Sequence, residues 1–172
     1  KKGFPFKYQV NQQFILKNKS LCINISIVNK DKESFNCGIG FHPWFNIHKN
    51  SKIYSNNFSY IEEHKKNIFK KKLFSNKKSL DLNKYKIDKT FINWNGRSKL
   101  AIDKDTAIEI INIKNIHNLH VYSPPKENFF CIEPVTNIGD SYNIKKHSKI
   151  YQGLKELKSN KKFEAKVEFR LI

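Results

Sequence analysis

The chain is 172 residues long, a length that suits one domain with a substantial buried core. Lysine and arginine together number 33 against 15 aspartate and glutamate residues, so the formal net charge is +18. Hydrophobic residues make up 38% and aromatic residues 13%, which excludes an intrinsically disordered chain, and no stretch is apolar for long enough to predict a membrane-spanning helix. We therefore expect one globular domain over residues 1–172.

The positive charge comes almost entirely from lysine, with 31 residues, whereas the only arginines are Arg97 and Arg170. Lysine, asparagine and isoleucine together account for 74 of the 172 residues, and all three have A/T-rich codons. Proteins that read nucleic acids rely on arginine, whose planar guanidinium group matches guanine and phosphate. The composition therefore favours neither a nucleic-acid partner nor a membrane partner, and a basic protein that binds either one is the least favoured hypothesis.

The three cysteines, Cys22, Cys37 and Cys131, are odd in number, and their spacing matches no zinc-binding pattern. Each lies among apolar or strand-like neighbours, so we expect buried, reduced thiols, no metal site and a reducing compartment, the cytoplasm. The chain begins at Lys1 and contains no methionine, which indicates a processed chain or a piece of a longer one.

Alternation of apolar and polar residues predicts β-strands along most of the chain. In residues 21–28 every odd position is apolar, and residues 13–16 form the expected partner strand across a turn at 17–20. Further strands are expected at 99–102, 107–113, 118–123, 129–133 and 163–171. Residues 49–90 are less regular, and their lysine clusters favour long loops and edge strands. Because no stretch of the chain repeats apolar side chains with a helical period, the sequence predicts an all-β antiparallel sandwich or barrel.

Residues 38–45, Gly-Ile-Gly-Phe-His-Pro-Trp-Phe, form the first segment that could carry chemistry. His42 is followed by proline, which restricts its backbone, and is preceded by glycines that allow close packing. The flanking aromatic residues could shield the imidazole and offer a flat surface to the apolar face of a sugar ring. A histidine packed within an aromatic core, with both ring nitrogens satisfied, is the alternative.

In the second segment, residues 129–137, Glu133 ends an apolar strand. Burial of an unpaired carboxylate is costly and favours a general base, whereas a glutamate at a strand end can equally point into water. His42 and Glu133 together form a candidate acid–base pair, because proton transfers at opposite ends of one bond need one protonated and one unprotonated group.

These segments resemble the C-terminal portion of the aldose 1-epimerase (galactose mutarotase) family. Residues 40–45 are similar to that family's Gly-x-His-Pro-Tyr-Phe motif, and residues 132–136 are similar to its strand ending in a catalytic Glu-Pro. Weaker similarities lie at residues 4–6, 87–91, 119–124 and 153–154 and in the final strand, in the family's order. The resemblance therefore extends over essentially the whole chain.

The resemblance implies a fold, the antiparallel β-supersandwich of the galactose mutarotase-like type, and a reaction, the interconversion of the α and β anomers of free hexoses such as glucose or galactose. In that reaction Glu133 would be the base that takes the proton of the C1 hydroxyl, and His42 would be the acid that protonates the ring oxygen. Asp88 would bind ring hydroxyls and Trp44 would line the pocket. No cofactor and no metal are implied.

The chain also departs from the family pattern. The family's N-terminal part, which carries another active-site histidine and an arginine, has no counterpart here, so we expect a sandwich that is incomplete at its N-terminus, with unpaired edges and exposed apolar surface. The remaining histidines are expected to be surface or structural residues; they are His48, His64, His117, His120 and His147. A non-catalytic protein that binds a sugar or sugar phosphate is the alternative function, which the lysine excess motivates because it suits phosphate.

Overall fold

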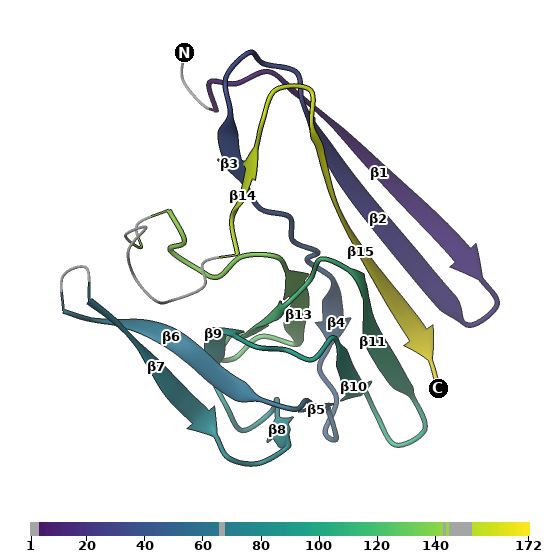
Figure 1. Cartoon of the computed structure of the whole chain (residues 1–172). Coiled ribbons are helices and arrows are strands. Elements are labelled where there is room, and N and C mark those ends of the chain that lie inside the picture. The colour runs from purple at the N-terminus through teal and green to yellow at the C-terminus, as the bar shows by residue number, and fades with distance from the viewer. Residues whose placement is uncertain (1–3, 66–67, 143, 145–152) are drawn as a thin grey trace.

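The computed structural model describes residues 4–65, 68–142, 144 and 153–172, and all regular secondary structure in these ranges is β-strand. The strands, labelled in Figure 1, are β1 (Tyr8–Lys17), β2 (Ser20–Asn29), β3 (Phe35–Cys37), β4 (Trp44–Asn46), β5 (Lys52–Tyr54), β6 (Phe58–Lys65), β7 (Ile68–Ser75), β8 (Ser79–Asp81), β9 (Ile87–Phe91), β10 (Arg97–Ala101), β11 (Ala107–Lys114), β12 (Asn118–Ser123), β13 (Phe129–Val135), β14 (Lys155–Leu157) and β15 (Lys162–Leu171). The part of the chain described here contains no helix long and apolar enough to span a membrane.

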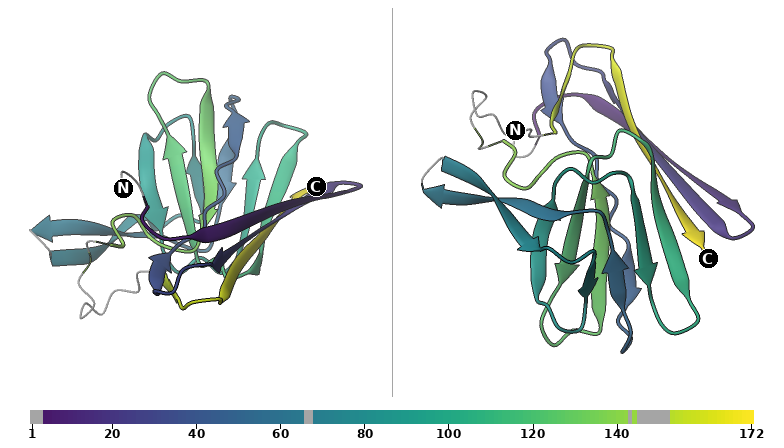
Figure 2. Two further views of the ribbon diagram at one scale, coloured as in Figure 1. Left: turned by 90° about the horizontal axis from the view of Figure 1, so that it is seen from above. Right: turned by 60° about the horizontal axis from the view of Figure 1, so that its bottom comes forward.

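Two large antiparallel sheets make up the molecule, in layers that Figure 2 shows from two directions. The first has the strand order β1-β2-β15-β11-β10-β5-β8, and the second has the order β4-β13-β12-β9-β6-β7. A small third sheet pairs β14 with β3. The all-β antiparallel sandwich expected from the alternating pattern is therefore confirmed.

The expected hairpins are present with their predicted turns. β1 and β2 pair from Tyr8↔Asn29 to Lys17↔Ser20, so β1 is longer than the predicted strand at 13–16. The turn of this hairpin contains Asn18, whose positive φ of 39° suits an asparagine. β10 pairs with β11, and β12 pairs with β13, as the patterns on either side of their polar turns predict.

Of the long loops and edge strands expected over residues 49–90, the edge strands are confirmed, since β7 and β8 each lie at an edge of their sheet, but the middle part is not a long loop. There β6 and β7 form a hairpin of two eight-residue strands, and β7 is the edge strand of its sheet. The lysines that obscured the pattern lie mostly on β7, where an edge position leaves lysine side chains room to reach water while their stems cover apolar surface. Lys72 of β7 forms an ion pair with Glu62 of β6, which ties the hairpin together.

The hydrophobic core lies between the two large sheets. Leu100, Ile110 and Val167 from the seven-stranded sheet and Val121 and Ile132 from the six-stranded sheet have no exposed surface and belong to one cluster. Along β15 buried apolar residues alternate with half-buried polar ones, as the period of two predicts. The odd-numbered isoleucines of β2 are only half-buried, because the core ends beneath this strand.

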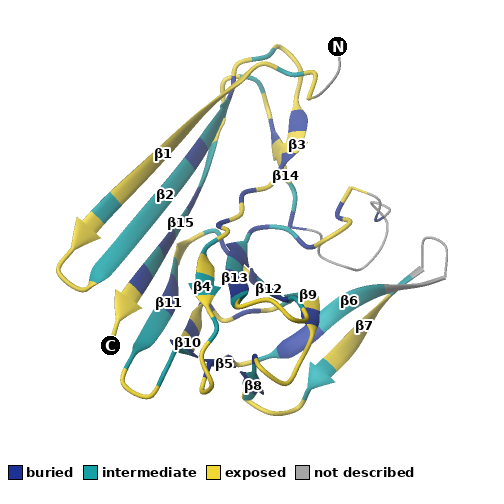
Figure 3. Ribbon diagram, turned by 180° about the vertical axis from the view of Figure 1, so that it is seen from behind, coloured by how far each residue is buried: buried dark blue, intermediate teal, exposed yellow. Residues whose placement is uncertain are grey.

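Strand β1 leaves apolar surface uncovered, as expected of an incomplete sandwich. Val10, Phe14 and Leu16 are 51%, 61% and 79% exposed, and β1 pairs with only one strand among the described residues. Figure 3 shows β1 as almost entirely exposed, in contrast to the buried segments of β11, β13 and β15. An edge of this kind is open to pairing with a further strand.

The ion pairs of Glu164 on β15 make the stability of the fold depend on pH. Its carboxylate pairs with Lys114 of β11 and, at 2.7 Å, with Lys162, and these hydrogen bonds lower its pKa from 4.5 to about 2. Because the pKa is lower in the folded chain than in the unfolded chain, the stabilisation is complete above about pH 4.5 and is lost as the pH falls towards 2.

We therefore expect Glu164→Gln to lower the free energy of unfolding at neutral pH by up to about 1 kcal/mol, the range of an exposed ion pair. The difference from the native chain should shrink below about pH 4.5 and disappear near pH 2. Urea denaturation over a series of pH values measures this directly. A deficit of the same size at acid and neutral pH would contradict the assignment.

Candidate active site

The candidate residues lie on the face of the six-stranded sheet that points away from the core. Phe130 and Ile132 of β13 are fully buried in the core, so Cys131 and Glu133, which alternate with them, face the other side. Residues paired across an antiparallel sheet share a face, and Glu133 pairs with His120 of β12, while Cys131 pairs with Trp44 of β4. Glu133, Cys131, His120 and Trp44 therefore stand on strands of one sheet.

His42 is brought to this face by the segment that precedes β4. The backbone N–H of Phe41 donates to the carbonyl oxygen of Pro134 at 3.0 Å, and Gly40 forms an isolated bridge with Val135. The approach is close: a Cβ on Gly38 would lie 1.9 Å from Oδ1 of Asn137, and a Cβ on Gly40 would lie 3.1 Å from Cγ1 of Val135, so a larger residue at either position would displace these side chains. The glycines of the motif therefore hold the histidine segment against the end of the strand that carries Glu133.

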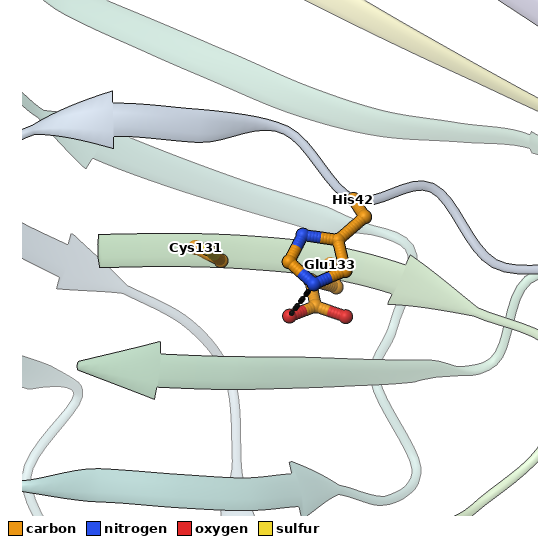
Figure 4. A group of neighbouring side chains, drawn as sticks. All are labelled: His42, Cys131 and Glu133. Atoms are coloured by element: carbon orange, nitrogen blue, oxygen red, sulfur yellow. Dashed lines mark ion pairs between the residues drawn. The ribbon is translucent and has the colours of Figure 1, made fainter. Parts of the chain in front are cut away.

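His42 and Glu133 contact each other, with Nε2 of the imidazole 3.5 Å from Oε1 of the carboxylate (Figure 4). The side chain of His42 is 56% exposed, and that of Glu133 is 13% exposed. The alternative hypotheses for these two residues are therefore wrong. His42 is not packed within an aromatic core, and Glu133 does not point freely into water. The structure thus brings together the two residues predicted to be acid and base.

The aromatic neighbours of His42 divide between the two faces of the sheet. Phe41 is buried in the core and Phe45 packs against it, so they do not shield the imidazole as expected. Trp44 instead stacks on the His42 ring, with centroids 5.8 Å apart, and on Phe129, with centroids 4.3 Å apart. With 63% of its surface exposed, Trp44 offers a flat apolar surface beside the acid–base pair.

The cysteines behave largely as the sequence predicts. All three are free; Cys37 and Cys131 are buried, and Cys22 is half-buried. Burial raises the pKa of the Cys131 thiol to about 11, and the charge of Glu133 adds to this effect. Desolvation likewise raises the pKa of Cys37 to about 11. Two of the thiols are therefore protonated at neutral pH and screened from oxidants.

Asp88 lies on β9, two strands away from Glu133, and is joined to the site by His120. Nε2 of His120 is 3.3 Å from Oδ1 of Asp88, and Nδ1 is 2.9 Å from Oγ1 of Thr90. The Asp88 side chain is 75% exposed, so its second oxygen is open to a ligand. Asp88, Thr90 and His120 line a cavity of about 260 Å³ with Glu62 and Lys89.

His120 is the residue that the sequence analysis missed. It was grouped with the surface or structural histidines, and among them His48 and His117 are indeed exposed. The side chain of His64 and the whole of His147 lie outside the described residues. The signal for His120 was its place in an alternating strand directly before the strand of Glu133, since hairpin pairing sets the two side chains opposite each other.

The fold that carries this site is that of the galactose mutarotase-like proteins. The chain superposes on a galactose mutarotase-like protein from Clostridium acetobutylicum with a TM-score of 0.81, at 18% sequence identity over 98% of this chain and 57% of the other. It also superposes on a galactose mutarotase related enzyme from Lactobacillus acidophilus with a TM-score of 0.76, at 21% identity over 98% of this chain and 63% of that one.

The family follows from the sequence itself. The profile of the aldose 1-epimerase family matches residues 1–170, and the chain belongs to this family. It is also 22% identical over 152 residues to the uncharacterized protein YphB of Escherichia coli K12, a match that takes in 80% of this chain and 52% of YphB. The chain therefore spans between about half and two thirds of the length of these relatives.

Proposed function

We propose that the chain is the catalytic portion of an aldose 1-epimerase that interconverts the α and β anomers of free hexoses. The observation that carries the proposal is the contact between His42 and Glu133 on an open sheet face beside an exposed tryptophan. A histidine and a carboxylate within reach of one another can act as acid and base on the two oxygens of one hemiacetal carbon. Family membership supports the same reaction.

The proposed reaction proceeds by ring opening. The carboxylate of Glu133 takes the proton of the C1 hydroxyl while protonated His42 donates its Nε2 proton to the ring oxygen, and the C1–O5 bond breaks to give an aldehyde. Rotation about C1–C2 presents the other face of the carbonyl. Reclosure returns the proton from Glu133 to O1 and the ring proton to His42, so that both groups end as they began. The proton balance is complete within the chain, and the proposal requires no cofactor.

Binding is assigned to the residues on either side of this pair. Trp44, stacked on Phe129, presents a flat apolar surface that suits the C–H face of a pyranose ring. On the other side the exposed oxygen of Asp88 accepts hydrogen bonds from ring hydroxyls, and His120 fixes the orientation of that carboxylate. Correct orientation of the sugar supplies much of the rate in a reaction of this kind.

Replacement of His120 tests this arrangement of the binding residues. We expect His120→Ala to raise the KM for the hexose about 10-fold to 100-fold with a smaller change in kcat, because Asp88 loses the ion-pair contact that orients it. His117→Ala, which removes an exposed histidine three residues earlier, serves as the control and should leave both constants unchanged. Equal effects of the two variants would contradict a binding role for His120.

Polarimetry of freshly dissolved α-D-glucose and α-D-galactose tests the function directly. The proposal predicts that the chain speeds the approach to anomeric equilibrium above the spontaneous rate. A hexose locked as its methyl glycoside should bind without change in rotation, since it has no C1 hydroxyl proton to give up. Absence of catalysis with the free hexoses, from a chain shown to be folded, would overturn the proposal for this chain.

The alternative, a protein that binds a sugar or sugar phosphate without turnover, rests on the net charge of +18. Lys89 lines the cavity beside Asp88, although it is paired with Glu62 at 3.4 Å. Binding of glucose and of glucose 6-phosphate, compared at low and high salt, separates the two functions. Tighter binding of the phosphate that weakens with salt, together with no catalysis, would favour the alternative.

A further inference from the structure

A third potential metal ligand lies beside the acid–base pair. Cys131 precedes Glu133 by two residues on β13 and therefore faces the same side of the sheet. One ligand atom from each of His42, Cys131 and Glu133 lies within 4.8 Å of the other two, and Figure 4 shows Cys131 on the strand that carries Glu133, to one side of the His42–Glu133 pair. No metal is expected from the sequence, because the spacing of the cysteines matches no zinc-binding pattern and the family resemblance implies none.

The separation of these atoms is close to that of a tetrahedral zinc shell. Bond lengths of about 2.0–2.3 Å place neighbouring ligands of Zn²⁺ about 3.4–3.6 Å apart. Nε2 of His42 and Oε1 of Glu133 are already 3.5 Å apart. The other separations in the cluster are at most 4.8 Å, and the histidine, with 56% of its side chain exposed, is the member with freedom to move closer.

The kinds of donor atom also select the metal. A thiolate, an imidazole nitrogen and a carboxylate oxygen suit Zn²⁺, which binds sulfur, nitrogen and oxygen in four-coordinate sites. Mg²⁺ and Ca²⁺ require six or more oxygen ligands, and one carboxylate does not supply them. Three protein ligands leave a fourth position for water on the exposed side of His42.

We propose that His42, Cys131 and Glu133 form a binding site for Zn²⁺, and that zinc bound there inhibits the enzyme. On binding, the metal displaces the thiol proton of Cys131, which passes to solvent. The imidazole nitrogen of His42 and the carboxylate of Glu133 coordinate the metal, so their lone pairs are no longer available. Neither residue can then exchange protons with a sugar. The inhibitory effect rests on the function proposed above, whereas the binding of zinc does not.

Cobalt titration of the chain without a histidine tag tests the site through a spectroscopic signature. Co²⁺ bound to a thiolate gives a sulfur-to-cobalt charge-transfer band in the near ultraviolet, which nitrogen and oxygen ligands do not produce. We expect one Co²⁺ per chain with this band, and loss of the band when Zn²⁺ is added in competition. The band should disappear in Cys131→Ser and remain in Cys37→Ser, which removes the other buried thiol.

A second variant, His42→Ala, tests the site independently in case Cys131→Ser does not fold. His42→Ala changes an exposed side chain, and it should weaken Co²⁺ binding at least 10-fold while the far-ultraviolet circular dichroism stays native. No charge-transfer band in the native chain, or a band that survives in folded Cys131→Ser, would overturn the proposal. Equal Co²⁺ affinity in His42→Ala and the native chain would also overturn it.

Polarimetry with added Zn²⁺ separates this proposal from the proposed function. In a catalytically active chain, Zn²⁺ should suppress mutarotation, EDTA should restore it, and Cys131→Ser should need at least 10-fold more Zn²⁺ for the same inhibition. A chain that shows the cobalt band but no catalysis would uphold the metal site and refute the epimerase. A chain that catalyses mutarotation without zinc inhibition or the cobalt band would refute the metal site alone.

Discussion

Glu133→Gln is expected to slow catalysed mutarotation by about 10²-fold to 10⁴-fold, the usual contribution of a general base. Glutamine has nearly the same shape as glutamate and keeps a hydrogen-bonding oxygen, but it cannot take the C1 hydroxyl proton. Because Glu133 is 13% exposed and its charge contacts only His42 among the ion pairs of the described residues, the neutral amide should fit without disturbing the strand. Polarimetry with saturating hexose measures the loss in kcat.

The matched control for this variant is Glu127→Gln. Glu127 is an exposed glutamate in the turn between β12 and β13, so its replacement makes the same change in charge close to the same strand. It should retain the native rate. A Glu133→Gln chain as active as the control would show that Glu133 is not the base, and the assignment of acid and base to this pair would fail.

The strands were predictable wherever one face of a sheet is buried and the other is not. The period of two along β15 and the polar turns before β11 and β13 reflect that asymmetry directly. The alternation of apolar and polar residues breaks down in β7, an edge strand in which lysines occupy successive positions 70–72. There the pairing with β6 rather than a buried face defines the strand, and pairing leaves little trace in the sequence of one strand alone.

The candidate site was predictable only in part, for a related reason. His42 and Glu133 each stand in a distinctive local segment, and their contact follows once the segment before β4 packs against the end of β13. Neither His120 nor Cys131 is marked by its sequence neighbours as part of the site, although Cys131 lies in the same segment as Glu133. Their places at the site depend on strand register and on the alternation of faces within β12 and β13, so only the assembled sheet reveals them.

The same alternation explains why one strand serves both the core and the site. Phe130 has no exposed surface and stacks against Phe45 with ring centroids 5.6 Å apart, while Glu133, three residues later, faces the opposite side of the sheet. A phenylalanine fixed in the core therefore holds the strand that presents the carboxylate.

Phe130→Ala is accordingly expected to lower the free energy of unfolding by about 3–5 kcal/mol, the range for removing a buried aromatic ring. This is a large part of the total stability of a typical domain, which is about 5–15 kcal/mol. Urea denaturation followed by tryptophan fluorescence measures the change, since Trp94 is buried in the same core cluster.

Leu73→Ala is the control for this core substitution. Leu73 lies on the edge strand β7 and is 59% exposed, so the same kind of truncation there should change the free energy of unfolding by no more than about 0.5 kcal/mol. Both variants shorten a large apolar side chain to alanine, so the difference between their losses of unfolding free energy reports the effect of burial. A loss of less than about 1 kcal/mol in Phe130→Ala would contradict the central place of this ring in the core.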